Sequence, residues 1–333
     1  MENFSRRKFG KLAIGGALGV AGSLGIPNWA RAQSGLKELI IAEPLHGIGY
    51  LPMYVSAANG YFAQEKIAIK ILTIESGSGH TNAVLTKQAF AFIGGPEHNA
   101  FAKAKGAELR AVVNVVNRGN VYLVAPKGAE PKDRNFSAYM KGKRIATGLY
   151  SGTPNSITRY LVGMWGLDSR KDVQLMEVTS AASLAAMKTK NADVAVVSEP
   201  LLTRGVREGI WGEPFYNVPR ELGDYAYSTL NIRKESIDSE PAVVAGFVRA
   251  IVKGLKFTEE NPRLAAEVAK KEFPTMALDD LQATIDRAFA DNLWSKDGKI
   301  SQGAWTTGSK VVRSADLLKS DVAYGEIIDM RFV

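Results

Sequence analysis

The sequence of 333 residues contains no cysteine. This absence excludes a disulfide framework, a thiolate metal site and a cysteine nucleophile, and it removes the residue that a lipoprotein anchor would modify. A membrane-spanning run is also lacking near the start of the chain. The uncharged stretch from Leu12 to Ile26 is rich in glycine and is too short to span about 30 Å of hydrocarbon as a helix. A membrane anchor is therefore the less favoured interpretation of this stretch.

The first 32 residues have the pattern of a signal peptide. The arginine pair Arg6-Arg7 precedes the apolar run, and the small-residue site Ala30-Arg31-Ala32 follows it. The twin arginines, the weakly hydrophobic run and the basic Arg31 resemble a twin-arginine translocation signal. We therefore expect residues 1–32 to be removed, and the mature chain to be periplasmic after export through the twin-arginine pathway.

Charge and length limit the function classes further. Residues 1–32 hold five basic residues and one acidic residue, so their removal lowers the net charge from +8 to +4. No Lys/Arg run or aromatic-interleaved basic patch remains, which argues against a nucleic-acid partner. About 300 mature residues exceed one comfortable hydrophobic core, so the length favours two domains.

Short β-branched runs alternate with helical stretches along the first part of the mature chain, which indicates parallel sheet covered by helices. The expected strands are 38–43, 67–74, 90–95, 110–116 and 121–125, and the expected helices are 51–65, 81–88 and 99–105.

A polar, turn-rich break at residues 126–133 precedes a second α/β set. Here we expect strands 143–147, 173–178 and 194–197, helices 155–165 and 182–190, an extended segment over 216–232, and late helices 243–257, 263–271 and 278–293. The late helices lack strands of their own, so they would cover the first sheet. The predicted fold is α/β, with two doubly wound lobes and a hinge of two crossing segments. Lobe one would comprise 33–125 plus 226–333, and lobe two 126–225. A single domain with a helical tail is the alternative.

Five motifs resemble one known family. They are Gly49-Tyr50-Leu51-Pro52-Met53-Tyr54 through Gly60-Tyr61-Phe62, Gly94-Gly95-Pro96-Glu97, Val116-Asn117-Arg118-Gly119, Ser198-Glu199-Pro200 and Trp294-Ser295-Lys296-Asp297-Gly298. Together they resemble the nitrate, sulfonate, taurine and thiamine-precursor binding proteins of ABC importers. The resemblance covers the mature chain and implies a periplasmic-binding-protein fold of type II. It also implies capture of a small organic solute or oxyanion, and a membrane ABC permease as partner. We expect a monomer with no cofactor and no enzymatic activity.

The candidate ligand-binding residues lie in loops after strands, where ligands collect in doubly wound domains. His46 and Tyr50 follow the first strand, and a tyrosine there can stack on a ligand or simply pack the helix start. Ser78, Gly79, His80 and Thr81 follow the second strand, where free N–H groups favour an anion or a carbonyl, although ordinary capping would also explain them.

Further candidates lie in the opposite lobe and after the third strand. Ser151, Gly152 and Thr153 begin a helix in lobe two, with Thr153 as the expected N-cap before Pro154. The last group comprises Pro96, Glu97, Arg118 and Glu199. Arg118 could pair with a ligand carboxylate or sulfonate, whereas the two glutamates prefer N–H donors or could pair with Arg118 itself. This mixture leaves the charge of the ligand open.

Metal and enzyme functions are the alternatives. His46, His80 and His98 all fall near expected strand ends, and three converging imidazoles could hold zinc or iron with Glu97 as a fourth ligand. Their spacings match no short metal motif, so the predicted site contains no metal. The sequence has no G-x-S-x-G, H-E-x-x-H or G-x-G-x-x-G motif in a suitable context, so no catalytic residues are predicted.

Overall fold

The computed structural model describes residues 35–333 of the chain, and Leu36–Val333 form one compact unit. The predicted signal peptide, residues 1–32, lies outside the described residues. Within residues 35–333, none of the helices combines the length and the apolar character that crossing a bilayer requires.

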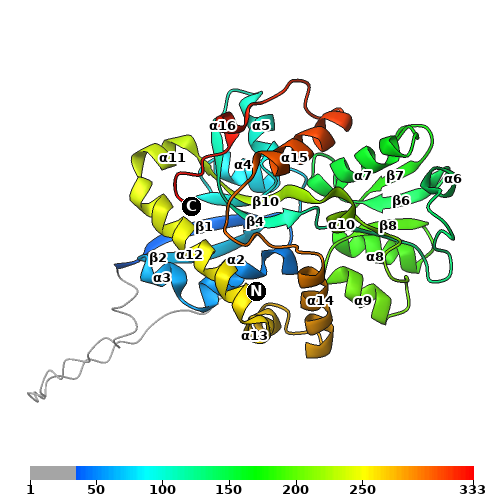
Figure 1. The fold of residues 1–333 in the computed structure, drawn as a ribbon, viewed down its shortest axis with the longest axis horizontal. Helices are drawn as coiled ribbons and strands as arrows, with labels where there is room; N and C mark the ends of the chain where they lie inside the picture. The colour runs from blue at the N-terminus through cyan, green and yellow to red at the C-terminus, as the bar shows by residue number, and fades with distance from the viewer. Residues whose placement is uncertain (1–34) are drawn as a thin grey trace, which may run out of the picture. The chain divides into compact units, whose positions relative to one another are not determined.

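The first of two five-stranded sheets has the strand order β2-β1-β3-β10-β4 (Figure 1). Its strands are β1 (Lys37–Glu43), β2 (Ile67–Thr73), β3 (Ala91–Gly94), β4 (Leu109–Arg118) and β10 (Asp224–Arg233). Strand β1 pairs in parallel with β2 and β3, whereas β10 runs antiparallel to both β3 and β4. All four residues of β3 are buried, as expected for a central strand with both faces covered.

The second sheet has the order β7-β6-β8-β5-β9. Its strands are β5 (Tyr122–Val124), β6 (Arg144–Thr147), β7 (Gln174–Glu177), β8 (Val194–Val197) and β9 (Tyr216–Asn217). Strand β6 is parallel to β7 and β8, and β5 is antiparallel to β8 and β9.

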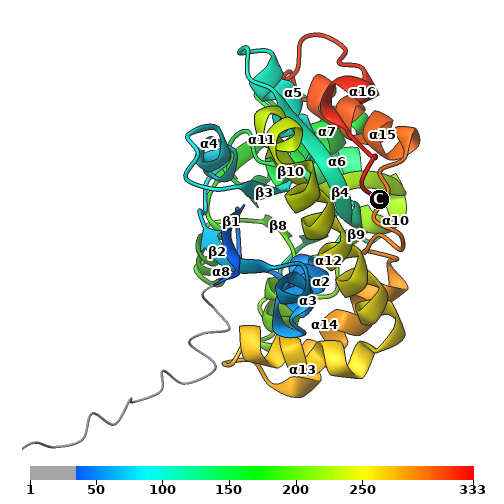
Figure 2. The same cartoon turned by 90° about the vertical axis from the view of Figure 1, so that its left-hand side faces the viewer.

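Helices cover both faces of the first sheet (Figures 1 and 2). One layer contains α2 (Leu51–Ala58), α3 (Tyr61–Gln64), α12 (Pro241–Glu260) and α13 (Pro262–Glu272); the opposite layer contains α4 (Gly79–Leu85), α5 (Glu97–Lys103), α15 (Gln302–Ser314) and α16 (Tyr324–Ile327). The short η2 (Ile48–Tyr50) precedes α2, and α11 (Lys234–Ser239) precedes α12. The second sheet is accompanied by α6 (Phe136–Met140), α7 (Thr153–Met164), α8 (Ser180–Lys188), α9 (Leu201–Arg207) and α10 (Val218–Leu222), while α14 (Leu278–Ala290) contacts α9.

The α/β class and the two-lobed fold are confirmed, but both sheets are mixed rather than wholly parallel. The reason is that β5 and β10, the first strands after the two crossings between the sheets, each pair with a neighbouring strand in the antiparallel direction. The expected helix 51–65 is interrupted, because Gly60 adopts a left-handed φ of 70° between α2 and α3.

The first crossing between the sheets differs in position from the sequence expectation. The expected strand 121–125 was assigned to lobe one, but β5 at Tyr122–Val124 pairs within the second sheet. The chain therefore leaves the first sheet after Arg118 and returns at Asp224 in β10. The precise lobe limits 33–125 plus 226–333 and 126–225 stay a prediction.

Candidate ligand-binding site

A cavity of about 90 Å³ lies between loops that belong to the two sheets. From the first sheet come the loops after β1, β2 and β3 and the strand β10, and from the second come the loops after β6 and β7. The lining includes Pro44, Leu45, Tyr50, Glu75, Ser76, Gly77, His80, Gly94, Gly95, His98, Gly148, Leu149, Gly152, Thr153, Pro154, Val178, Thr179, Ser180, Tyr227 and Ser228. This is the position that parallel strand order predicts, beyond the carboxyl ends of the strands.

The loops of the two lobes touch at the rim of the cavity. A Cβ atom placed on Gly77 would lie 1.8 Å from the carbonyl oxygen of Tyr150, so only glycine permits this backbone approach. Beside it, the Ser180 backbone N–H donates to Oε1 of Glu75 over 2.8 Å. The lobes are therefore closed around the cavity.

A hydrogen bond between Thr153 and Glu97 also joins the lobes. Helix α7 begins at Thr153, and its N-cap is Gly152 rather than the expected Thr153. The Thr153 hydroxyl is thus free to donate to Oε1 of Glu97 over 2.6 Å, while Oε2 of Glu97 has no hydrogen-bond partner among the described residues. Burial raises the pKa of Glu97 to about 7, and the Thr153 hydrogen bond opposes this rise.

The histidines His80 and His98 form a buried pair on the cavity wall. Their ring centroids are 4.7 Å apart in an edge-on arrangement. Neither ring nitrogen of His80 has a partner among the described residues. Burial lowers the pKa of His98 to about 4, and burial together with His98 holds the pKa of His80 well below its ordinary value. Both imidazoles are therefore neutral near pH 7.

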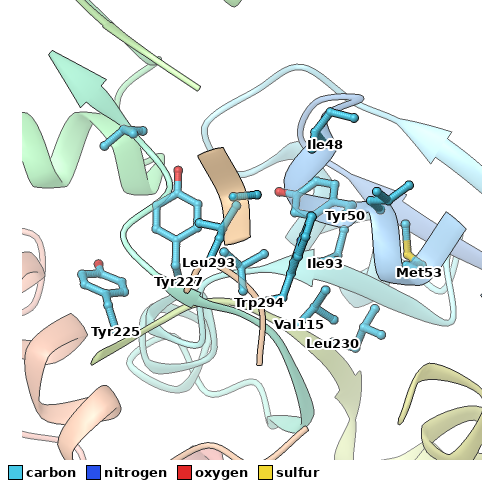
Figure 3. Close-up of a cluster of buried hydrophobic side chains, with 14 of the residues drawn as sticks. Ile48, Tyr50, Met53, Ile93, Val115, Tyr225, Tyr227, Leu230, Leu293 and Trp294 are labelled. Carbon is cyan, nitrogen blue, oxygen red and sulfur yellow. The ribbon is translucent and has the colours of Figure 1, made fainter. Parts of the chain in front are cut away.

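The two tyrosines on the wall come from different elements. Tyr50 ends η2, Tyr227 belongs to β10, and both are part of the buried cluster drawn in Figure 3. Both side chains are about 5–6% exposed. Burial raises the pKa of each phenol above its ordinary value, so both are neutral hydroxyls that can donate to a ligand.

Glu97 and five other predicted site residues lie next to the cavity without lining it. Ser78 is the N-cap of α4 and Gly79 its first residue, but the Ser78 side chain makes no capping hydrogen bond. Thr81 is buried, and its hydroxyl has no hydrogen-bond partner in the described part of the chain. Pro96 is the N-cap of α5, and Ser151 has a positive φ of 66° beside Gly77. Contact of these residues with a ligand stays a prediction.

The remaining predicted residues are engaged with neighbouring protein groups. His46 pairs with Glu272 and Glu43, which raise its pKa to about 9. Arg118 pairs with Asp224. The buried Glu199 carboxylate accepts from the Thr203 backbone N–H and hydroxyl, and from Arg287 over 3.0 Å. The sequence also allowed an ion pair between Arg118 and Glu199, but each of them pairs with a different residue. A ligand-binding role for His46, Arg118 and Glu199 stays a prediction.

A three-histidine metal site has no counterpart in residues 35–333. Among them, no group of three His, Asp or Glu side chains is arranged to hold a metal ion. His46 stacks on Tyr54 and Phe273, whereas His80 and His98 contact each other.

Sequence reasoning missed Tyr227 and Ser228 altogether, and it did not single out Glu75, Thr179 or Ser180. The alternation Tyr225-Ala226-Tyr227 is a strand signal with one aromatic face, but nothing local indicates that this strand joins the centre of the first sheet. The other three residues follow β2 and β7, so the rule that places ligands after strands would have found them.

The buried Glu97 carboxyl leads to a pH prediction. Its folded pKa of about 7 lies above the ordinary value of 4.5, so its protonated form favours the folded state. That contribution is complete below about pH 4.5 and is lost as the pH rises through 7. We expect the unfolding free energy of Glu97→Gln to gain about 3 kcal/mol relative to wild type across this range.

Chemical denaturation of both proteins at several pH values would measure this difference. Taking the difference cancels His80 and His98, whose lowered pKa values give the opposite slope below pH 6.5. Glu259→Gln, at an exposed position, serves as the control. A pH-independent difference for Glu97→Gln would contradict the raised pKa.

Comparisons with known proteins agree with this geometry. A family model described as NMT1/THI5-like matches residues 48–265, which is more than half of the chain. YtlA of Bacillus subtilis, named a binding protein without a stated ligand, is 21% identical over 304 residues, covering 90% of each chain. The riboflavin-binding protein RibY of Chloroflexus aurantiacus is 24% identical over 325 residues, covering 91% of this chain and 88% of RibY.

A solved structure supports the fold at lower identity. The alkanesulfonate-binding protein SsuA of Xanthomonas axonopodis, bound to MOPS, superposes with a TM-score of 0.72 at 15% identity, over 88% of this chain and 98% of SsuA. The fold is thus that of the periplasmic binding proteins, and by its family match the chain belongs to the NMT1/THI5-like family.

Proposed function

We propose that this protein is the solute-binding component of an ABC importer. The observation that carries the proposal is the cavity, because both lobes line it and touch each other at its rim. A ligand in that position contacts both lobes and so stabilises the closed state over the open one, which is a population shift. The closed form then presents a distinct surface to a membrane permease.

The proposal includes the cellular setting. The twin-arginine pattern at residues 6–7 and the small-residue site at 30–32 support export to the periplasm. We propose that the exported protein acts as a monomer and releases its solute unchanged. The names of the relatives, which mention riboflavin and alkanesulfonate, define compounds for the first screen.

A thermal-shift and calorimetry screen tests this function. The compounds are nitrate, taurine, alkane and aryl sulfonates, aromatic carboxylates, hydroxymethylpyrimidine and riboflavin. We expect at least one compound to bind with a stoichiometry of one and to raise the melting temperature, since binding to the native state alone stabilises it. Turnover of a compound without saturable binding would contradict the proposal and favour an enzyme.

Thr153→Ala tests whether the bridge between the lobes supports binding. The substitution removes the donor to Glu97, and we expect the Kd of a bound solute to rise on the order of tenfold, the equivalent of one good hydrogen bond. Thr306→Ala is the matched control, because Thr306 is exposed on α15. A lower melting temperature with unchanged Kd would instead give Thr153 a purely structural role.

A further inference from the structure

The cavity wall carries no fixed positive charge. Among the residues of the described chain that line it, none is lysine or arginine. The arginines predicted or observed nearby are engaged elsewhere: Arg118 pairs with Asp224, and Arg159 pairs with Glu177 and lies over the Tyr150 ring. An anion entering the closed cavity would lose its hydration without gaining a countercharge, which is unfavourable.

One acidic group lines the cavity and a second lies buried behind its wall. The start of α7 has partial positive charge, and the Glu97 carboxyl, which accepts from the hydroxyl of the first residue, Thr153, offsets that charge when it is ionised. The same carboxyl lies against Gly95 on the cavity wall, where a Cβ atom would come within 2.0 Å of Oε2. Glu75 adds a second carboxylate to the lining. Glu75 repels anions and attracts N–H donors or cations, and Glu97 does the same once it is ionised, above its pKa of about 7.

Unpartnered polar atoms on the wall define what a solute must offer. His80 is 2% exposed, lines the cavity and has no partner at either ring nitrogen within residues 35–333. A neutral imidazole presents one N–H donor and one acceptor nitrogen. The Ser228 hydroxyl is buried on the same wall, next to the Tyr50 hydroxyl. A solute that both donates and accepts hydrogen bonds would satisfy these groups, and buried polar groups require such partners.

The size of the cavity limits the solute. Its volume of about 90 Å³ is of the same order as the roughly 150 Å³ of an engineered protein cavity that binds benzene, so the closed cavity limits a solute to about one ring. The Tyr50 and Tyr227 side chains on the wall are suited to contact a flat ring.

Resting on the function proposed above, we propose that this cavity selects uncharged or cationic solutes of one ring that carry an N–H group, and that it excludes carboxylates, sulfonates and nitrate. The Glu97 carboxyl accepts from the N–H group of the solute, and His80 forms the complementary donor and acceptor contacts. Selectivity therefore comes from the absence of a countercharge as much as from the hydrogen bonds.

A series of probes with one shape and three charges tests this inference. Benzamidine is cationic, benzamide neutral and benzoate anionic, and nicotinamide with nicotinate gives a second matched pair. Calorimetry at pH 7.5 on the mature protein is expected to detect benzamide, benzamidine or nicotinamide. The corresponding anion is expected to bind at least tenfold more weakly. Glu97→Gln should lower the affinity for benzamidine at least fivefold relative to benzamide, whereas Glu259→Gln should leave both unchanged.

The outcomes separate this inference from the broader function. Binding of benzoate or nicotinate as tight as that of its amide would overturn the inference, as would binding of nitrate or a sulfonate alone, yet either result would uphold solute binding. Binding of riboflavin alone would overturn the limit to one ring. No saturable binding of any probe or screened solute would overturn both the inference and the proposed function.

Discussion

Replacing Gly77 by alanine is expected to weaken solute binding on the order of a hundredfold. The added Cβ atom would meet the Tyr150 carbonyl oxygen at 1.8 Å and the Ser151 Oγ at 2.8 Å. The first of these is a backbone atom, which cannot swing aside as a flexible side chain can. The lobes must therefore separate at this rim, and a solute then keeps its contacts with one lobe only.

Each lobe should remain folded in this variant. Gly77 does not adopt a positive φ, so alanine fits its backbone conformation, and the clash arises only between the lobes. Calorimetry with a bound solute measures the affinity, and small-angle scattering measures the expected increase in the radius of gyration. Gly163→Ala is the matched control, because a Cβ atom there, in α7, meets nothing within 4 Å. An unchanged Kd for Gly77→Ala would show that closure at this rim is not needed for binding.

Local patterns predicted the loops of the site better than its individual contacts. Tyr50, His80, Gly152 and Thr153 were chosen because they follow strands, and all four line the cavity. The rule works because parallel strands bring their carboxyl ends to one edge of a sheet. It could not identify Tyr227 and Ser228, because their strand β10 inserts between β3 and β4, more than 100 residues earlier in the chain.

The ion pairs of the site residues likewise could not be predicted from the local sequence. Arg118 pairs with Asp224, and Glu199 with Arg287, so each partner lies in a segment that sequence spacing does not connect. Side-chain type alone left Arg118 equally suited to a ligand carboxylate or to an internal one. Only the three-dimensional register decides which carboxylate it faces.

The direction of a strand within its sheet likewise could not be predicted from the local sequence. Alternation of strand and helix predicted the α/β class and two lobes, because it requires crossover connections. Strand β10 has the same β-branched and aromatic character as its neighbours, and hydrophobic pattern does not encode whether a strand runs parallel or antiparallel. The mixed sheets arise from the two crossings, which bring β5 and β10 into their sheets from outside the local alternation.

Asp291 provides the second large expected effect, because it joins the end of α14 to the second sheet. Its side chain is fully buried and accepts from the Tyr122 hydroxyl at 2.8 Å, from Asn217 Nδ2 at 3.1 Å and from Arg220 Nε at 2.6 Å. Tyr122 lies in β5 and Asn217 in β9, so one carboxylate holds two strands of the second sheet.

Asp291→Ala should lower the free energy of unfolding by about 2–4 kcal/mol, because the buried Tyr122 hydroxyl and the partly buried Asn217 amide each lose their acceptor at a cost of about 1–3 kcal/mol. The Arg220 side chain is largely exposed, so water solvates it in the variant. Chemical denaturation measures the change. Asp286→Ala, at an exposed position of α14, should change stability by less than about 0.5 kcal/mol.

A double-mutant cycle with Tyr122→Phe identifies the contact responsible. If the Asp291 carboxylate and the Tyr122 hydroxyl stabilise the fold through their hydrogen bond, the two losses should fall short of additivity by about 0.5–3 kcal/mol. Additive losses would mean that Asp291 acts through Asn217 and Arg220 instead. A loss below about 1 kcal/mol for Asp291→Ala would contradict the structural role altogether, since water would then have replaced the carboxylate at little cost.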